Sequence, residues 1–370
     1  MKKTAEEVLQ EALSAWDWNA IVVGAVRYGA GHINDTFCVY TQTASGDCVR
    51  YILQRINTNT FRDPDALMEN IAGVTGYLRK IIEKSGGDPM RETMNVVPTR
   101  EGKPYYADSD GGAWRVYTFV EETVCLQKVE TPEQFYESAY AFGNFQRLLA
   151  DYPADTLHET IENFHNTVWR YENFEKALAA DTCGRAKDVE KEVEFVKAHK
   201  EDCAFMVNLL KEGKLPLRVT HNDTKLNNIL MDKATGKGIC VIDLDTVMPG
   251  LAANDYGDSI RFGANDCAED EPDLSKVNFS LPLFETYTEG FLAAAGGALT
   301  DLEKETLVWG AKLMTLECGI RFLTDYLEGD HYFKVHREGH NLDRCRTQFK
   351  LVSDMEKYWD DMKAIVKKHS

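Results

Sequence analysis

The spacing of apolar residues divides the chain into an extended N-terminal part and a helical remainder. After an amphipathic stretch at about residues 4–15, β-branched and aromatic residues flank a glycine turn in residues 21–41, and further apolar runs follow at residues 49–56 and 111–121. Short runs of this kind, bounded by turns, are typical of β-strands. Residues 64–84 differ, because their apolar side chains recur every three or four positions as in a helix. We therefore expect an antiparallel sheet that carries one helix.

Beyond residue 130 the helical spacing dominates, and one segment interrupts it. Residues 131–213 and those from 256 onward show helical periodicity, whereas residues 215–245 contain short apolar runs separated by a polar loop and a glycine turn. No linker-like composition separates the two parts. The pattern predicts an α+β protein with two lobes in contact, a small sheet-based N-lobe (residues 1–120) and a larger, mostly helical C-lobe (residues 121–370).

Charge and cysteine content narrow the classes of partner. The 370 residues have 60 acidic and 42 basic side chains, for a formal net charge of −18. That field repels nucleic acid and anionic membranes, but a small anionic ligand such as a nucleotide can bind where a local cation reverses the sign. The nine cysteines are scattered and form no CxxC motif, which favours free thiols in a reducing compartment. With no signal-peptide pattern and no apolar run of about 18 residues, we expect a cytoplasmic protein.

The strongest chemical signal is the loop HNDTKLNN (residues 221–228), followed by VIDLD (residues 241–245). Asp223 lies in this loop after an apolar strand, Asn228 begins the next strand, and Asp243 ends the strand after that. A hairpin of these two strands brings Asn228 and Asp243 together at one end, with Asp223 on the loop between them. Turn chemistry accounts for each residue singly but not for the three spacings together.

These residue types suit phosphoryl transfer. The amide oxygen of Asn228 and the carboxylate of Asp243 are hard ligands that Mg²⁺ accepts when phosphate oxygens complete its shell. A separate carboxylate, Asp223, can orient the attacking hydroxyl and accept its proton. Lys225 would offset the negative charge that develops on the transferred group.

The spacing resembles the catalytic loop and metal-binding aspartate of protein kinases, and the ID pair in place of DFG is closer to the aminoglycoside phosphotransferase/choline kinase family. Within that family, the chain from about residue 20 to 365 is similar to the bacterial N-acetylhexosamine 1-kinases, through the segments YGAGHIN, GGAWRVY, VTHNDTKLNNILMD, IDLDTVMPG, DYGDSIRFGA and ECGIRFLTDYLEGDHYF. The resemblance implies a bilobal, protein-kinase-like fold with ATP and Mg²⁺ in the cleft. It also implies that the partner is a small sugar, phosphorylated on the anomeric C1 hydroxyl of N-acetylglucosamine or N-acetylgalactosamine.

The resemblance adds roles around the catalytic loop. His221 belongs to the catalytic group, in a role that orients the loop, and Asp255 matches the aspartate that holds this loop from beneath. Asp258 and Arg261 are expected either to pair with each other or to make contacts at the start of a helix. Asp245, two residues after the metal aspartate, suits a secondary metal or water contact, or a capping or surface role.

A glycine turn at residues 28–34, here called the flap, lies upstream of the catalytic loop. Gly29 and Gly31 leave room for backbone N–H groups to bind the phosphates of ATP, and we also assign Asn34 to the nucleotide. The resemblance implies that His32, at the tip of the flap, contacts the sugar.

One position departs from the kinase pattern. Kinases carry a lysine or arginine on the third strand that pairs with the ATP phosphates, but this chain has Gln54 there, with Arg55 beside it. Because side chains alternate along a strand, only one of the two can face the cleft, and both are kept as candidate nucleotide contacts. Glu69 is the candidate for the helix glutamate that normally pairs with the missing lysine.

The remaining assignments rest on analogy. The segment that joins the lobes is expected to bind adenine, with Tyr117, Phe119 and Glu121 as nucleotide contacts. The candidate sugar contacts are Asp223, His32, Trp114 or Arg115, Arg321 and Tyr332. Arg321 lies among apolar residues, where a charge is costly unless it is paired, so an ion pair with Asp325 or another acid is the alternative reading.

Two rival functions remain open from the sequence. One is a kinase of the same fold that acts on another small hydroxyl compound, such as choline, an aminoglycoside or homoserine. The other is a non-catalytic protein that binds a nucleotide or a sugar and releases no ADP. The sequence predicts neither the oligomeric state nor a preference between the two hexosamines.

Overall fold

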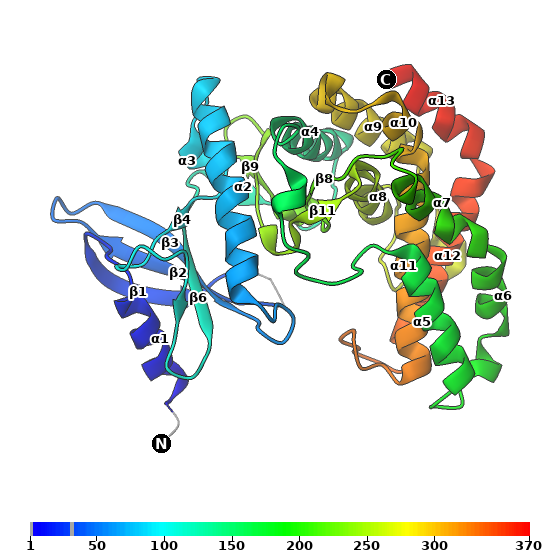
Figure 1. Cartoon of the computed structure of the whole chain (residues 1–370), viewed down its shortest axis with the longest axis horizontal. Coiled ribbons are helices and arrows are strands. Elements are labelled where there is room, and N and C mark those ends of the chain that lie inside the picture. The colour runs from blue at the N-terminus through cyan, green and yellow to red at the C-terminus, as the bar shows by residue number, and fades with distance from the viewer. Residues whose placement is uncertain (1–2, 30–32) are drawn as a thin grey trace.

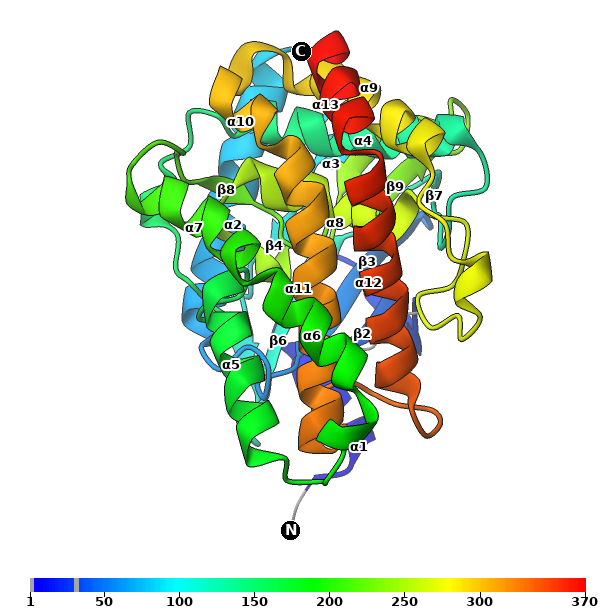
Figure 2. The same ribbon diagram turned by 90° about the vertical axis from the view of Figure 1, so that its right-hand side faces the viewer.

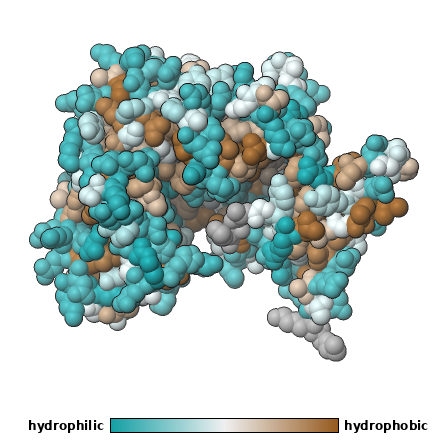
Figure 3. All heavy atoms as spheres, turned by 180° about the vertical axis from the view of Figure 1, so that it is seen from behind, coloured by the Kyte–Doolittle hydropathy of each residue, from teal (hydrophilic) through white to brown (hydrophobic). Residues whose placement is uncertain are grey.

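Two lobes lie side by side, a smaller one built on a sheet and a larger one built from helices (Figure 1). The structure is a computed structural model that describes residues 3–29 and 33–370. Seen from behind, the surface is hollowed between the lobes (Figure 3). The predicted α+β class, with an antiparallel N-terminal sheet and a helical C-terminal part, is confirmed.

The N-lobe sheet is antiparallel, with strand order β1-β2-β3-β6-β4 and β5 also paired to β6. Its strands are β1 (Ile21–Arg27), β2 (Asp35–Gln42), β3 (Cys48–Ile56), β4 (Val96–Val97), β5 (Tyr106–Ala107) and β6 (Ala113–Thr118). The register places Gln54 of β3 opposite Arg115 of β6, and Arg55 opposite Trp114. Because directly opposed residues share a face of a sheet, Gln54 and Arg115 lie on one face and Arg55 on the other.

Three helices accompany this sheet: α1 (Ala5–Ser14), α2 (Pro64–Lys84) and α3 (Pro89–Glu92). Helix α1 begins with a capping box formed by Thr4 and Glu7. Helix α2 lies between the sheet and the C-lobe (Figure 1), and its apolar face shares one core with C-lobe residues such as Phe145 and Val247. The buried Asn70 on α2 donates hydrogen bonds to the carbonyl oxygens of His158 (2.8 Å) and Val247 (3.0 Å). Helix α2 is therefore anchored to the C-lobe.

The C-lobe surrounds short strands with helices. Its helices are α4 (Pro132–Leu148), α5 (Thr167–Ala180), α6 (Glu190–Ala198), α7 (Lys200–Lys211), α8 (Ala252–Gly263), α9 (Leu281–Ala295), α10 (Asp301–Glu305), α11 (Leu307–Glu328), α12 (His340–Lys357) and α13 (Trp359–His369). Helix α11 runs between α5 and α12 (Figure 2). The strands form a sheet β10-β9-β7 and a pair β11-β8, with bounds β7 (Thr123–Cys125), β8 (Arg218–Thr220), β9 (Ile229–Asp232), β10 (Gly238–Val241) and β11 (Met248–Gly250).

Helices α8 and α11 approach closely through two glycines. A Cβ atom added at Gly257 would lie 2.1 Å from the carbonyl oxygen of Gly310, and one added at Gly310 would lie 2.0 Å from that of Ala253. These contacts are with backbone, which cannot move aside as a flexible side chain can. The close approach matters for function because α8 carries Asp255 and Asp258, which lie beneath the catalytic loop.

We expect Gly257→Ala to destabilise the protein by about 1–3 kcal/mol or more, since overpacking a tight helix contact forces the backbone apart. Urea unfolding measures the loss. The matched control is Gly76→Ala in α2, where an added Cβ meets no atom within 4 Å; this change should raise stability by about 0.5–1 kcal/mol. Equal effects at both positions would contradict the packing argument.

All nine cysteines are free thiols. Over residues 3–29 and 33–370, no helix combines the length and the apolar character needed to span a membrane.

Candidate active site

The loop that follows β8 is held by carboxylates of helix α8. The buried Asp255 accepts hydrogen bonds from the backbone N–H groups of His221 (2.9 Å) and Asn222 (2.8 Å). Asp258 accepts one from the N–H of Thr224 (3.0 Å) and pairs with Arg261 at 3.0 Å. Both contacts agree with the expectations for this segment. Helix α8 thus fixes the backbone of the loop, while the side chain of Asp223 stays partly exposed.

His221 is fully buried and holds the loop to the neighbouring hairpin. Its Nε2 lies 2.8 Å from the carbonyl oxygen of Ile242, and its Nδ1 accepts the N–H of Asp223 at 3.2 Å. The edge of the ring also packs against Phe142 and Phe145. These contacts suit a residue that orients the loop, and a fully buried imidazole has no surface with which to touch a reactant.

Asp223 and Asn228 are joined directly. The side-chain amide of Asn228 donates to the carbonyl oxygen of Asp223 (2.8 Å) and to its Oδ2 (3.1 Å). The other carboxylate oxygen of Asp223 pairs with Lys225 Nζ at 2.6 Å, and both side chains are about one third exposed. Because Asn228 uses its N–H₂ group on Asp223, its Oδ1 is left as a ligand oxygen.

Asp243 lies beside Asn228 at the end of the β9–β10 hairpin. The N–H of Ile242 donates to the carbonyl oxygen of Asn228 at 2.9 Å, and Asp243 itself is in the left-handed region with φ of 60°. Although the side chain of Asp243 is exposed, desolvation by the surrounding protein, followed by the nearby carboxylates of Asp245 and Asp223, raises its pKa to about 6. A carboxylate and an amide oxygen in a site with surplus negative charge are the donors that a divalent cation requires. Asn228 and Asp243 therefore have the chemistry to fit a divalent cation such as Mg²⁺.

This electrostatic cost gives a pH-dependent prediction. An aspartate whose pKa is raised in the folded state destabilises the protein increasingly as the pH rises through that pKa. Since Mg²⁺ binds only the ionised form, we expect Mg²⁺ alone to raise the Tm more at about pH 7.5 than at about pH 5. Differential scanning fluorimetry checks this. A Tm shift that is the same at both pH values, or that survives in Asp243→Asn, would place Mg²⁺ elsewhere.

Asp245 faces the N-lobe. Its Oδ1 lies 2.5 Å from Nη1 of Arg115, and its Oδ2 accepts the side-chain amide of Asn34 at 2.6 Å. Arg115 is 1% exposed and donates twice to Oε1 of Gln54, at 3.0 and 2.9 Å. The sugar contact expected for Arg115 does not fit this burial, because cross-strand pairing with Gln54 turns its guanidinium into the protein.

The other candidate nucleotide residues lie in different surroundings. Gly29 has φ of 79°, a conformation that favours glycine; Gly31 and His32 lie outside the described residues. Arg55 is on the opposite face of the sheet from Gln54, 3.7 Å from Asp108. Of the two neighbours that alternation left open, Gln54 is therefore the one that shares a face with Arg115.

In the segment that joins the lobes, Phe119 and Glu121 both contact Arg50. The guanidinium of Arg50 lies 3.8 Å from the ring centre of Phe119 and pairs with Glu121. The Tyr28 ring packs against Phe119 from the flap side, with centroids 5.6 Å apart. Tyr117 is buried in the core, and its hydroxyl has no partner among the described residues. Its side chain therefore packs in the core between the sheet and helix α2.

Arg321, on α11, lies between aromatic rings of other segments. Its guanidinium is 5.5–5.8 Å from the ring centres of Phe164, Tyr332 and Phe333, and Nη2 is 3.4 Å from the hydroxyl of Tyr332. The nearest acid is Glu317, at 3.9 Å. Asp325, offered as its partner from the sequence, instead accepts three backbone N–H groups, those of residues 331–333. Arg321 is held by stacking and Glu317.

A buried chain of side chains connects Arg321 to the catalytic loop. His165 lies 3.1 Å from Glu317 Oε1 and 3.3 Å from the carbonyl oxygen of Asn222, next to Asp223. Burial lowers the pKa of His165, but Glu317 outweighs it and raises the pKa above the ordinary value. Burial and the nearby Arg321 lower the pKa of Arg170 to about 10. Of the two arginines, only Arg321 pairs with Glu317, while Arg170 donates to the carbonyl oxygen of Phe164.

Sequence reasoning missed His165, Arg170 and Glu317. Each stands alone in the sequence, without a neighbouring motif, and only the packing of α5 against α11 unites them. The structure does not support the candidate role of Glu69. Its side chain is 68% exposed and pairs with His158 of the C-lobe at 2.7 Å, and not with a cation on β3.

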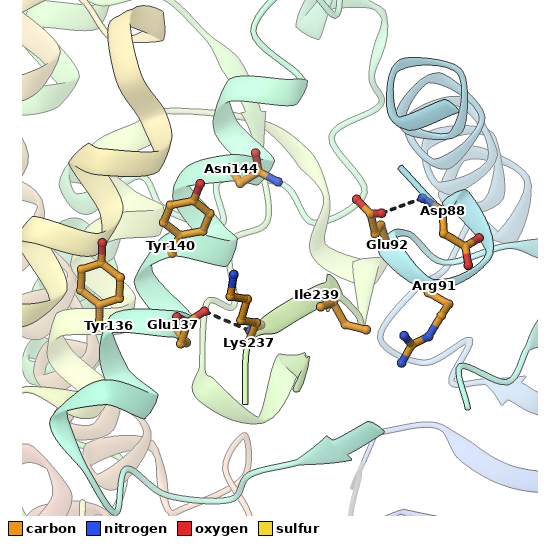
Figure 4. A pocket seen from close by; sticks show the side chains of 10 residues that line it. Asp88, Arg91, Glu92, Tyr136, Glu137, Tyr140, Asn144, Lys237 and Ile239 are labelled. Atoms are coloured by element: carbon orange, nitrogen blue, oxygen red, sulfur yellow. Dashed lines mark hydrogen bonds between the residues drawn. The ribbon is translucent and has the colours of Figure 1, made fainter. Parts of the chain in front are cut away.

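A separate cavity of about 530 Å³ lies between α3, α4 and β10 (Figure 4). Two of its charged groups already have partners: Arg91 pairs with Asp232 at 2.9 Å, and Glu137 accepts the N–H of Gly238 at 3.3 Å. None of the described site residues lines it. We therefore do not place the active site there.

A second acidic cluster, far from the catalytic loop in the sequence, is already neutralised. His199, Asp202 and Glu356 have the spacing of metal ligands. However, Nζ of the buried Lys312 lies 2.8 Å from both Asp202 and Glu356. An ammonium group thus occupies the position that a cation would take.

Comparison with known proteins identifies the fold and a family. The sequence profile of the APH phosphotransferase enzyme family matches residues 24–288. An aminoglycoside phosphotransferase from Alicyclobacillus acidocaldarius superposes with a TM-score of 0.61 at 13% identity, covering 100% of this chain and 98% of that one. Choline kinase from Cryptosporidium parvum superposes with a TM-score of 0.57 at 14% identity, covering 99% of this chain and 99% of that one. Amicoumacin kinase hAmiN, solved with AMP-PNP, Ca²⁺ and Ami, superposes with a TM-score of 0.57 at 13% identity. The match covers 96% of this chain and 94% of that one.

Proposed function

Because the chain belongs to the APH phosphotransferase enzyme family, we propose that it transfers the γ-phosphate of ATP to the anomeric C1 hydroxyl of N-acetylglucosamine or N-acetylgalactosamine. The observation that supports phosphoryl transfer most directly is the grouping of Asp223, Asn228 and Asp243 at one end of the β9–β10 hairpin. The choice of an N-acetylhexosamine rests on the sequence resemblance described above.

In this mechanism, Asp223 orients the acceptor hydroxyl and takes its proton. An anomeric hydroxyl is more acidic than an ordinary alcohol, so the proton can leave late in the reaction, and such a base contributes about 10²–10⁴ in rate. Lys225, now paired with Asp223, is close enough to turn towards the transferred phosphoryl group and offset its charge. Asn228 and Asp243 hold Mg²⁺, which when bound screens the phosphate oxygens and aligns them for attack.

The guanidinium of Arg321 supports a neutral, oxygen-rich acceptor. Its side chain is 16% exposed and lies 3.9 Å from Glu317. A cationic acceptor such as choline or an aminoglycoside would meet a like charge there, whereas hydroxyl and acetamido oxygens can accept hydrogen bonds from a guanidinium group. This favours the sugar over the amine acceptors among the rival kinases.

We expect Arg321→Ala to raise the KM for the sugar about 10- to 100-fold while the KM for ATP changes little. Each charge-assisted hydrogen bond is worth about 1.5–3 kcal/mol, which corresponds to this range. Steady-state kinetics with each substrate varied in turn measures both constants. The control is Arg346→Ala, which removes an arginine that pairs with Glu192 on α6. An unchanged sugar KM would remove Arg321 from the acceptor site.

A coupled assay for ADP release tests the proposed function. The panel contains N-acetylglucosamine, N-acetylgalactosamine, their methyl glycosides, choline, an aminoglycoside and homoserine. We expect release only with the two free hexosamines, because a methyl glycoside blocks the C1 oxygen. Turnover of an amine or of homoserine would identify a different kinase of this fold, and no ADP release with any acceptor would favour a binding protein.

A further inference from the structure

The chain lacks the lysine that kinases carry on the third strand, and an arginine on the adjacent strand stands directly opposite the vacant position. Gln54 of β3 and Arg115 of β6 are paired in the register of the sheet. Opposed residues have Cβ atoms about 4.5–5.5 Å apart, where two cations would repel each other. A neutral acceptor at position 54 is therefore what an arginine at position 115 requires.

The guanidinium of Arg115 is fixed on two sides. Nε and Nη2 both donate to Oε1 of Gln54, at 3.0 and 2.9 Å, and Nη1 lies 2.5 Å from Oδ1 of Asp245. The side chains of Arg115 and Asp245 are 1% and 5% exposed. A charge buried so completely is tolerated only when it is paired and hydrogen-bonded, so Asp245 determines where Arg115 points.

Asp245 extends this contact to the flap. Its second oxygen accepts the amide of Asn34 at 2.6 Å, and Oδ1 of Asn34 accepts the N–H of Asn57 at 2.9 Å. One carboxylate of the C-lobe thus joins the base of the flap to strand β6. The same carboxylate is two residues from Asp243, so the link reaches the proposed metal site.

The pair also distinguishes the two acids of this segment. Asp245 is buried and paired with Arg115, whereas Asp243 is exposed and has no ion-pair partner among the described residues. Asp243 is therefore the carboxylate available to a divalent cation.

We propose that the Arg115–Asp245 ion pair takes the place of the lysine–glutamate pair of kinases, as the link between the lobes that positions Asn34 and Asp243 for Mg–ATP. Arg115 is then a positioning residue and not a sugar contact. The inference rests on the proposed use of ATP and Mg²⁺, but not on the identity of the acceptor.

Binding of the analogue Mg–AMP-PNP, measured by calorimetry, tests the pair without any acceptor. We expect Arg115→Met and Asp245→Asn each to weaken binding at least about 10-fold, since either change removes a buried charge-assisted contact. Because both changes break the same link, the double variant should be no weaker than the worse single one. Arg115→Lys, which keeps the charge but loses the two-pronged geometry, should fall between wild type and Arg115→Met. The control is Arg100→Met, whose guanidinium contacts only the carbonyl oxygen of Trp16 among the described hydrogen bonds.

The double variant also guards against misfolding, because removing both members of a buried ion pair is often tolerated whereas removing one is not. If the folded double variant binds Mg–AMP-PNP as tightly as wild type, the pair is only structural and the inference is overturned. If wild-type protein binds no Mg–AMP-PNP, the proposed function fails before the variants are considered. A loss of affinity in the double variant, with unfolding stability near that of Arg100→Met, supports the inference.

Discussion

Replacing Asp223 with asparagine is expected to lower kcat by about 10²–10⁴-fold, the usual contribution of a positioned general base. Asparagine keeps the size and most hydrogen bonds of the side chain but cannot accept a proton. Because Asp223 is proposed to face the acceptor hydroxyl, the affinity for Mg–AMP-PNP should stay near the wild-type value. Rapid-quench kinetics and calorimetry on the same preparation provide the two numbers.

The matched control is Asp151→Asn, at an exposed aspartate outside the catalytic loop. It should match wild type in both measurements. A nearly unchanged kcat in Asp223→Asn would remove Asp223 from the role of base. A large loss of nucleotide affinity in that variant would instead assign Asp223 to the metal or the phosphates.

Asp243→Asn is expected to fail in a different way. It should weaken Mg–AMP-PNP binding at least about 10-fold and lower kcat about 10²-fold or more, because a neutral amide at this position gives up the single charged ligand of the proposed metal pair. Binding of ADP in the presence of a chelator should change little. Calorimetry that finds unchanged Mg–AMP-PNP affinity would place the metal on other residues.

The two variants together separate the roles that a shared loss of activity would confuse. Asp223 and Asp243 are both acids near Asn228, yet Asp223 pairs with Lys225 whereas Asp243 lies near the carboxylates of Asp245 and Asp223. The first arrangement leaves a carboxylate partly exposed beside a cation, where an acceptor hydroxyl can approach it. The second creates a demand for a cation.

The catalytic loop could be read from the sequence because its residues are close together in the chain. Asp223, Asn228 and Asp243 belong to one loop and one hairpin, so their spacing alone predicts which end of the strands they share. The hydrogen bonds of Asp255 to the loop were also foreseen, through the resemblance. The α+β class followed from hydrophobic periodicity.

The links between distant segments could not be read in this way. Arg115 and Asp245 are 130 positions apart, and alternation along β3 said only that Gln54 and Arg55 face opposite sides. The partner strand and its register, which follow from tertiary pairing, decide that Gln54 meets Arg115. Arg321 does pair with an acid, but the acid is Glu317 and not Asp325, whose carboxylate accepts local backbone N–H groups. Glu69 likewise pairs with His158 and not with a cation on β3.

In the candidate acceptor region, the sequence identified Arg321 but not the residues around it. Arg321 stood out because a charge among apolar residues requires a partner. Its partner Glu317 lies on α11, and His165, in the loop before α5, connects Glu317 to the backbone of Asn222. This connection suggests that the position of the acceptor and that of Asp223 are set together.

The position of the phosphate in the product tests the central claim most directly. Asp223 can reach only one hydroxyl in line with the γ-phosphate, since a misplacement of about 1 Å can cost about 10²-fold in rate. Two-dimensional ³¹P–¹H NMR of the purified product from N-acetylglucosamine should show the phosphorus coupled to the anomeric proton. Coupling to the C6 protons, or good turnover of a methyl glycoside, would contradict transfer to C1.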